Sequence, residues 1–278
     1  MIPPEATPPP RVIATDLDRT LLRSDGTTSQ RTRDALDLAA SQGTHIVAVT
    51  ARPIRWLARL IPQFGLLPHV IASNGALCFD LTTGSAYDLR PFDPDGIATL
   101  LEVLRKALPD ARIALETASG LAREPDYELS PMDPDAADPG RRVGVVADLL
   151  SGLGDDPVLK IVVTDRDRRS AEMFVDAAPA VAGLADLTYS TDRGLLELGP
   201  RGVTKATTLA AWCAARGITA DEVVAFGDMP NDLPMLRWAG RSYAVANAHP
   251  DVLAAAGGGT GSNDEDGVAA VVEELFHG

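Results

Sequence analysis

Residues 11–22 read RVIATDLDRTLL, and this stretch is the most informative about the architecture of the chain. The apolar, β-branched first half, Arg11–Asp16, predicts a short buried strand. Two aspartates, Asp16 and Asp18, stand where that strand ends. In parallel α/β sheets, ligands bind beyond the carboxyl ends of the strands. The stretch therefore predicts a parallel sheet with an acidic ligand site at the end of its first strand.

Downstream of this strand, the chain alternates between helix and strand. The pattern predicts a helix, a strand, a helix and a strand in turn over Ser29–Ser41, Thr44–Thr50, Ile54–Phe64 and His69–Ser73. It resumes after residue 199, over Thr204–Arg216, Val223–Asp228, Asn231–Ala239, Ser242–Ala246, Pro250–Ala255 and Gly267–Phe276. Such alternation is typical of a parallel sheet covered by helices on both faces. We expect an α/β fold whose Rossmann-like core is built from residues 11–76 and 199–278.

Residues 77–198 follow a different pattern. A β-hairpin is predicted around a turn at Thr83–Ser85, and a loop rich in Pro and Asp over Asp126–Gly140. Strands and helices are predicted in mixed order over Asp95–Leu108, Arg112–Thr117, Val158–Thr164, Ala171–Val181, Leu187–Thr191 and Leu195–Leu198. We interpret this stretch as an α+β cap domain inserted into the core.

The composition limits the classes of function. The formal net charge of −14 disfavours binding to nucleic acid or to anionic lipid. No apolar run approaches the roughly 20 residues that cross a bilayer, so we expect no membrane contact. The first ten residues, MIPPEATPPP, lack the pattern of a secretory signal and predict a disordered tail. Two distant cysteines, Cys78 and Cys213, predict buried free thiols, and together these features indicate a cytoplasmic protein. The oligomeric state stays open.

Polar residues also follow the other predicted strands. Thr50 ends the second strand, Lys205 opens the helix after the insert, and Asp228, Asn231 and Asp232 follow the late strand. Carboxylates packed this closely would repel one another unless a cation lay among them. Mg²⁺ prefers oxygen ligands and commonly binds carboxylates together with a substrate phosphate. The pattern therefore predicts a magnesium site that holds a phosphoryl group, where a carboxylate can attack phosphorus.

The sequence disfavours two other kinds of ligand site. An EF-hand calcium loop that began at Asp16 would need Gly at its sixth position and Glu at its twelfth, but Leu21 and Thr27 stand there. The glycine-rich segment Gly257–Ser262 lacks the lysine of a phosphate-binding loop and predicts a flexible loop instead.

Four segments resemble the motifs of the haloacid dehalogenase (HAD) superfamily, in the order that the family has them. DLDRT at 16–20 resembles motif I, DxDxT, and GDMPND at 227–232 resembles motif IV, GDxxND. Thr50 within VAVTAR resembles motif II, and Lys205 resembles motif III. The resemblance spans nearly the whole chain and is closest in kind to the Cof-like phosphatases, a group that includes sugar-phosphate phosphatases.

Two flanking segments extend this resemblance, and three positions depart from it. SNGA at 73–76 is similar to the junction into a type IIB cap, and DGVA at 266–269 is similar to the family's closing helix. Where the family often has Gly, this chain has Arg19, Ala51 and Ala206. If the backbone at position 19 needs a positive φ, Arg19 is strained there.

The resemblance implies a role for each motif residue. Asp16 would attack phosphorus and bind Mg²⁺, and Asp18 would act as general acid and base while its backbone carbonyl binds the metal. Lys205 would neutralise charge on Asp16 and on the phosphate. Asp228 would be the third protein ligand of the metal.

The remaining motif residues would support phosphate binding. Thr50 and Asn231 would hydrogen-bond the phosphoryl oxygens, Arg19 would contact them through its backbone N–H, and Asp232 would support the metal's water shell. The cap would select the substrate, and Arg90, Arg123 and Arg193 are candidates for that task.

The resemblance predicts a Mg²⁺-dependent phosphatase that acts on small phosphorylated metabolites, with sugar phosphates as one class. Because fold does not fix function, two alternatives stay open: a phosphomutase and a non-catalytic phosphate-binding protein. A receiver-type signalling domain also has an acidic pocket with Thr and Lys, but it would lack the second Asp of DxD and the large cap.

Overall fold

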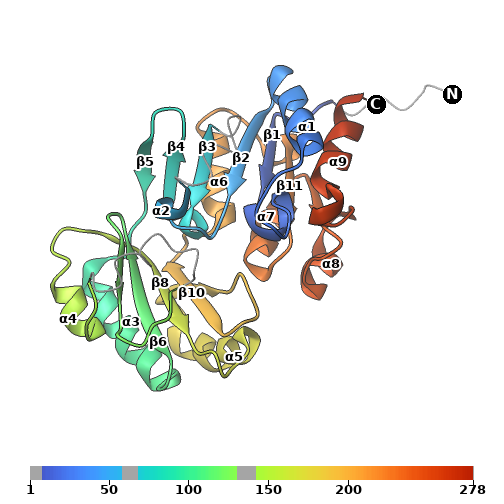
Figure 1. The fold of residues 1–278 in the computed structure, drawn as a ribbon. Helices are drawn as coiled ribbons and strands as arrows, with labels where there is room; N and C mark the ends of the chain where they lie inside the picture. Colours follow the sequence, from blue (N-terminus) through green and yellow to red (C-terminus); the bar gives the residue numbers. More distant parts are fainter. Residues whose placement is uncertain (1–7, 58–67, 130–141, 278) are drawn as a thin grey trace.

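The computed structural model describes residues 8–57, 68–129 and 142–277. Figure 1 shows that they form two separate β-sheets, each packed against helices. The larger sheet has eight strands in the order β13-β12-β11-β1-β2-β3-β4-β5. Its first six members pair in parallel, and β4 and β5 pair antiparallel at one edge. The strands span β1 (Val12–Thr15), β2 (His45–Val49), β3 (His69–Ala72), β4 (Leu77–Asp80), β5 (Ser85–Leu89), β11 (Val223–Gly227), β12 (Arg241–Ala244) and β13 (Gly258–Gly259).

Helices cover both faces of the larger sheet, which explains why its central strands are apolar throughout. On one face α1 (Gln30–Ser41) packs against α9 (Gly267–His277), and on the other α6 (Lys205–Ala214) packs against α7 (Leu233–Trp238). Two shorter helices, α2 (Ile54–Leu57) and α8 (Pro250–Ala255), complete this half of the molecule. The sequence prediction of an α/β fold with a parallel core sheet is therefore confirmed.

The smaller sheet has five strands in the order β7-β6-β8-β10-β9, all antiparallel. In Figure 1 it lies below the larger sheet, with α3 and α5 on its far side. Residues at alternate positions of its strands pack with these helices into a second hydrophobic core. Its elements are α3 (Pro94–Ala107), β6 (Arg112–Thr117), β7 (Leu121–Arg123), α4 (Val146–Ser151), β8 (Val158–Thr164), α5 (Ser170–Val181), β9 (Ala185–Thr188) and β10 (Leu195–Pro200).

The sheets divide the chain at slightly different points from the predicted domain bounds, at both ends of the insert. The predicted hairpin forms, but β4 pairs with β3 and so extends the larger sheet, although residues 77–89 were assigned to the cap. Pairing with an existing sheet edge satisfies backbone groups that a separate hairpin would leave to water. At the other end, β10 continues to Pro200 and belongs wholly to the smaller sheet.

Several local predictions also need correction or lie outside the described residues. Pro10, placed in a disordered tail, is buried, and its carbonyl accepts a hydrogen bond from the Thr44 hydroxyl at 2.7 Å. The glycine-rich segment predicted as a flexible loop contributes the edge strand β13. Residues 1–7 of the tail, residues 58–64 of the helix predicted after Pro53 and residues 130–140 of the predicted loop lie outside the described part.

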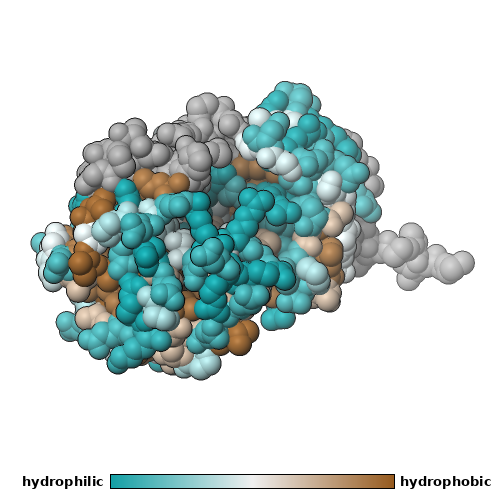
Figure 2. Space-filling view, turned by 60° about the horizontal axis from the view of Figure 1, so that its bottom comes forward, coloured by the Kyte–Doolittle hydropathy of each residue, from teal (hydrophilic) through white to brown (hydrophobic). Residues whose placement is uncertain are grey.

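Both cysteines are buried and free, as predicted. Burial raises the pKa of the Cys78 and Cys213 thiols to about 11, which keeps them protonated at neutral pH. Among the residues that the structure describes, no helix is long and apolar enough to span a membrane. Figure 2 shows that the face carrying the smaller sheet is predominantly hydrophilic.

Candidate active site

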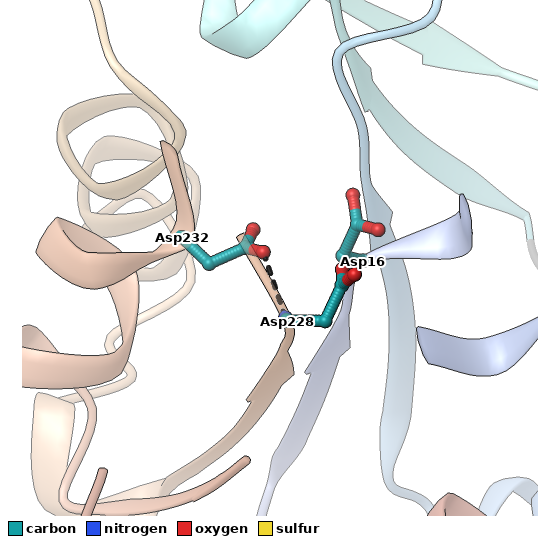
Figure 3. A group of neighbouring side chains, drawn as sticks. All are labelled: Asp16, Asp228 and Asp232. Atoms are coloured by element: carbon teal, nitrogen blue, oxygen red, sulfur yellow. Dashed lines mark hydrogen bonds between the residues drawn. The ribbon is translucent and has the colours of Figure 1, made fainter. Parts of the chain in front are cut away.

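The acidic residues converge where the strand order of the larger sheet changes direction. The chain leaves β1 toward β2 on one side, while β11 lies on the other side of β1. Such a switch point leaves a crevice beyond the carboxyl ends of the strands, where ligands bind. Asp16 follows β1 there, and Asp228 follows β11. Figure 3 shows the carboxylates of Asp16, Asp228 and Asp232 gathered at this edge.

Lys205 joins two of these carboxylates. Its Nζ donates to Asp16 Oδ1 at 2.6 Å and to Asp232 Oδ1 at 2.7 Å. Lys205 is 1% exposed and Asp232 is fully buried, so both contacts lie in a region of low dielectric. The other oxygen of Asp16 accepts no hydrogen bond from the residues that the structure describes. That oxygen is consequently available for chemistry.

Asp232 also fixes the turn that carries Asp228. Its Oδ2 accepts the backbone N–H groups of Asp228 and Met229, both at 3.0 Å. This close approach explains why residue 227 is Gly: a Cβ there would lie 2.6 Å from the Cβ of Asp232. Any side chain at position 227 would displace Asp232, and with it one of the two partners of Lys205.

Among the described residues, only one carboxylate oxygen of Asp228 accepts a hydrogen bond. The Thr20 hydroxyl donates to Asp228 Oδ1 at 3.0 Å, which gives the Thr of DxDxT a structural role. Asp228 Oδ2 is buried and has no hydrogen-bond partner in the described part of the chain, and the same holds for Asn231 Oδ1. Buried polar atoms without partners are rare in folded proteins and commonly mark a ligand or ion position.

The electrostatics of the cluster favour a cation. Burial, with further contributions from the neighbouring carboxylates, raises the pKa of Asp16 well above its ordinary value, although Lys205 opposes this. Burial and Asp232 raise the pKa of Asp228 to about 7. Burial opposes protonation of Lys205, but Asp16 and Asp232 outweigh it and raise its pKa. When all four groups are ionised, three carboxylates and one ammonium leave the site with two negative charges in excess.

The donor set fits a hard divalent cation. One carboxylate oxygen each from Asp16, Asp228 and Asp232 can be chosen such that all three lie within 4.8 Å of one another. All three residues are buried, and Asp228 Oδ2 has no other partner. Oxygen donors with excess negative charge are what Mg²⁺ requires. The resemblance implied a supporting part for Asp232 and included Asp18 among the ligands. The structure adds Asp232 to the group of carboxylates that lie closest together.

Asp18 lies apart from this buried cluster, at the wall of a large cavity. Its side chain is 51% exposed, and Arg52 holds it through two hydrogen bonds of 2.6 and 2.5 Å. Arg52 is not among the residues predicted from the sequence, although its position two residues after Thr50 was a signal. Asp18 therefore stands where it can reach solvent and a bound substrate, while Asp16 lies deeper.

Arg19 adopts φ 61° and ψ 9°, so the positive φ that was expected to strain a non-glycine residue at this position is present. Left-handed backbone costs an L-residue about 1–2 kcal/mol. The carbonyl of Arg19 accepts a hydrogen bond from Asn247 Nδ2 at 2.8 Å, which helps to hold this conformation.

Thr50 follows β2 and Asn231 follows β11, the two strands that flank β1. Thr50 is fully buried, and its hydroxyl oxygen accepts the Arg52 N–H at 3.1 Å. Asn231 Nδ2 donates to Asn74 Oδ1 at 3.1 Å, which brings the SNGA turn against motif IV. Asn74 is not among the site residues predicted from the sequence. Contact of Thr50, Asn231 and Arg19 with phosphate stays a prediction.

A cavity of about 1130 Å³ lies between the two sheets at this site. We call the side formed by the larger sheet its floor and the side formed by the smaller sheet its roof. The floor is lined by Asp16, Asp18, Arg19, Asp228 and Asn231, and β8 and β10 contribute to the roof. Of the three cap arginines proposed from the sequence, Arg193 lines the cavity. The other two are not among the residues that line it: Arg90 binds Asp88 and Thr208, and Arg123 binds backbone carbonyls that include that of Tyr127.

Replacing Lys205 with methionine should destabilise the protein. The substitution leaves Asp16 and Asp232 buried without their cation, and breaking a buried ion pair in this way costs about 3–5 kcal/mol. Because the pKa of Lys205 is raised in the fold, its contribution is fully present at neutral pH and is lost only as pH rises through that raised value. Denaturant unfolding at pH 7 measures the change. A matched control is Lys106→Met, which removes the same charge from an exposed position on α3.

Comparison with known proteins agrees with this geometry. The sequence model of a family described as haloacid dehalogenase-like hydrolase matches residues 13–272. The stress response protein YhaX of Bacillus subtilis is 31% identical, with 96% of this chain and 93% of that protein covered. The 5-amino-6-(5-phospho-D-ribitylamino)uracil phosphatase YitU of the same species is 27% identical, with 96% and 98% covered.

A solved structure matches the fold over nearly its whole length. The crystal structure of SMU.1108c from Streptococcus mutans has a TM-score of 0.81 at 25% identity, with 96% of this chain and 99% of that chain covered. The family match, the relatives and the fold all extend across the motif residues and both sheets. The chain therefore belongs to the haloacid dehalogenase-like hydrolases, in their Cof-like group.

Proposed function

We infer that this protein is a Mg²⁺-dependent phosphatase that hydrolyses monoesters of small metabolites through an aspartyl-phosphate on Asp16. The observation that carries this proposal is the state of Asp16: Lys205 binds one carboxylate oxygen, and the other has no partner among the described residues beside the cavity. A buried carboxylate held in this way is restrained for attack. Membership of a hydrolase family that includes the phosphatase YitU supports the reaction class.

The proposed reaction has two steps, and each conserves atoms and charge. The free oxygen of Asp16 attacks phosphorus, the bond from phosphorus to the ester oxygen breaks, and Asp18 gives its proton to the departing alcohol. Water then attacks phosphorus, Asp18 takes a proton from it, and the bond to Asp16 breaks to release phosphate. The positions support this division, because Asp16 is buried while Asp18 is half exposed at the cavity wall.

Lys205 and the metal have separate tasks in this scheme. Asp16, Asp228 and the backbone carbonyl of Asp18 would hold Mg²⁺, with Asp232 close by. When bound, the ion neutralises charge on the phosphoryl oxygens. Lys205 favours the ionised form of the nucleophile, against the effect of burial. It also restrains rotation of the carboxylate, because its two contacts tie Asp16 to the fully buried Asp232.

Removal of the metal should abolish turnover. We expect p-nitrophenyl phosphate hydrolysis to fall at least 100-fold in EDTA and to return with excess Mg²⁺, because two uncompensated negative charges would oppose an approaching phosphate. The measurement is release of inorganic phosphate, with folding monitored by circular dichroism as control. Full turnover in excess chelator would contradict the metal requirement. Phosphoryl transfer to a second hydroxyl without free phosphate would indicate a mutase.

A further inference from the structure

The cavity-facing side of the smaller sheet carries three buried charges. Alternate residues of its strands face away from α3 and α5, and among them are Glu116 on β6, Lys160 on β8 and Glu197 on β10, all lining the cavity. They are 5%, 4% and 3% exposed, respectively. Glu116 stands opposite Lys160 in the strand register, and Val162 stands opposite Glu197. Charges buried this deeply need partners, so each contact is informative.

Two of these charged side chains contact residues on the larger sheet's side of the cavity. Glu116 forms an ion pair with Arg55 of α2, with Oε1 2.6 Å from Nη2. Lys160 Nζ donates to the backbone carbonyl of Ala51 at 2.7 Å. Ala51 directly follows Thr50 in motif II, so the contact joins the roof of the cavity to the predicted phosphate-binding segment.

Glu197 is only half satisfied. Its Oε1 accepts from Lys160 Nζ at 2.7 Å, but its Oε2 is buried with no hydrogen-bond partner in the described part of the chain. On the opposite side of the cavity, the Trp56 indole N–H is likewise buried without a partner. The cavity wall therefore offers one unused acceptor and one unused donor, away from the acidic floor.

We propose that Glu197 is a specificity-determining residue that accepts a hydrogen bond from a neutral hydroxyl on the substrate's leaving group. This proposal rests on the phosphatase function, since the cavity has to hold the alcohol part of a phosphomonoester. A hydroxyl fits better than an ammonium group, because the Lys160 ammonium already balances the charge of Glu197 and would repel a second cation at this distance. The substrate class is hydroxyl-bearing phosphomonoesters, such as sugar and polyol phosphates.

Lys160 is the positioning residue for this contact. It holds Glu197 through Oε1 and is itself fixed by the carbonyl of Ala51. One ammonium group therefore connects Glu197 to motif II.

The test compares two kinds of substrate on Glu197→Gln. The substrates are glucose 6-phosphate, ribose 5-phosphate and glycerol 3-phosphate on one side, and p-nitrophenyl phosphate, which has no hydroxyl on its leaving group, on the other. Hydrogen bonds to charged groups are the stronger kind, so we expect kcat/KM for the preferred hydroxyl substrate to fall about 10- to 100-fold relative to p-nitrophenyl phosphate. On the wild-type enzyme, removing the recognised hydroxyl (a series of single deoxy analogues) should cause a similar loss without any mutation.

The matched control is Glu116→Gln, a buried glutamate on the same sheet face whose carboxylate is paired with Arg55. It should change both kinds of substrate by the same factor. An equal effect of Glu197→Gln on both substrates, an absence of any sensitive hydroxyl, or a preference for phosphoethanolamine would each overturn the proposal. Failure of the wild-type enzyme to release phosphate from any substrate would instead contradict the phosphatase function itself.

Discussion

Replacing Asp16 with asparagine is expected to abolish both turnover and the phosphorylated enzyme. The amide has almost the same shape as the carboxylate and can still accept from Lys205, but it cannot attack phosphorus. Removing a nucleophile that acts as part of a catalytic unit typically costs about 10⁴-fold or more in rate. The measurement is transfer of ³²P from a labelled substrate to protein after an acid quench, together with release of phosphate.

The same substitution should leave stability unchanged or increase it. Burial raises the pKa of Asp16, so the folded protein binds a proton more tightly at this position than the unfolded chain does. In the absence of metal, the ionised carboxylate therefore destabilises the fold as pH rises above its pKa in the unfolded chain, about 3.9. A neutral amide avoids this destabilisation. Denaturant unfolding in EDTA at pH 7 should show Asp16→Asn at least as stable as the wild type, in contrast to Lys205→Met. A large loss of stability would mean that the missing activity reflects damage to the fold.

The sequence predicted the floor of this site well, because local patterns determine it. Short β-branched runs end at Asp16, Thr50 and Asp228, and parallel strands bring their carboxyl ends to one edge of the sheet. Lys205 was predicted from its place at the start of a helix, and the structure puts its ammonium between Asp16 and Asp232. The chemical roles of these residues stay predictions.

The roof of the cavity could not be predicted in the same way. Glu116, Lys160 and Glu197 are separated in sequence and meet only because β6, β8 and β10 pair in one register. Within apolar strands their charges gave no sign of which partner each would find. The sheet that β4 and β5 join could not be predicted for a related reason: a hairpin pattern predicts the hairpin but does not say which sheet edge it joins.

The part that Arg52 plays in the site could be predicted from the sequence only in part. It stands close to motif II in the sequence, so its presence near the site was foreseeable, but its partner was not. The structure shows its guanidinium across from Asp18, with one hydrogen bond to each carboxylate oxygen. Because Asp18 is half exposed, this pair contributes little to stability, and its main effect is to orient the carboxylate.

Replacing Asp18 with asparagine should separate the two chemical steps. In the proposed reaction Asp18 first protonates the departing oxygen and later takes a proton from water. The p-nitrophenolate ion is stable without protonation, so the first step needs little help, whereas the attacking water still needs a base. General acid–base help is typically worth about 10²–10⁴ in rate. We therefore expect Asp18→Asn to give a burst of p-nitrophenol near one equivalent per site, followed by slow turnover, and to accumulate phosphorylated protein.

A matched control tests whether the position of the carboxylate, rather than loss of any acid near the cavity, causes the burst. Asp192 also lines the cavity and also pairs with an arginine, Arg169, but it belongs to the smaller sheet's side. Asp192→Asn should therefore turn over p-nitrophenyl phosphate without a burst. Asp18 lies outside the buried carboxylate group, and its expected metal contact is through the backbone, so Mg²⁺ affinity should be preserved in Asp18→Asn. If Asp18→Asn formed no phosphorylated protein while Asp16→Asn did, the two aspartates would have to exchange roles, and the deeper burial of Asp16 would then need another explanation.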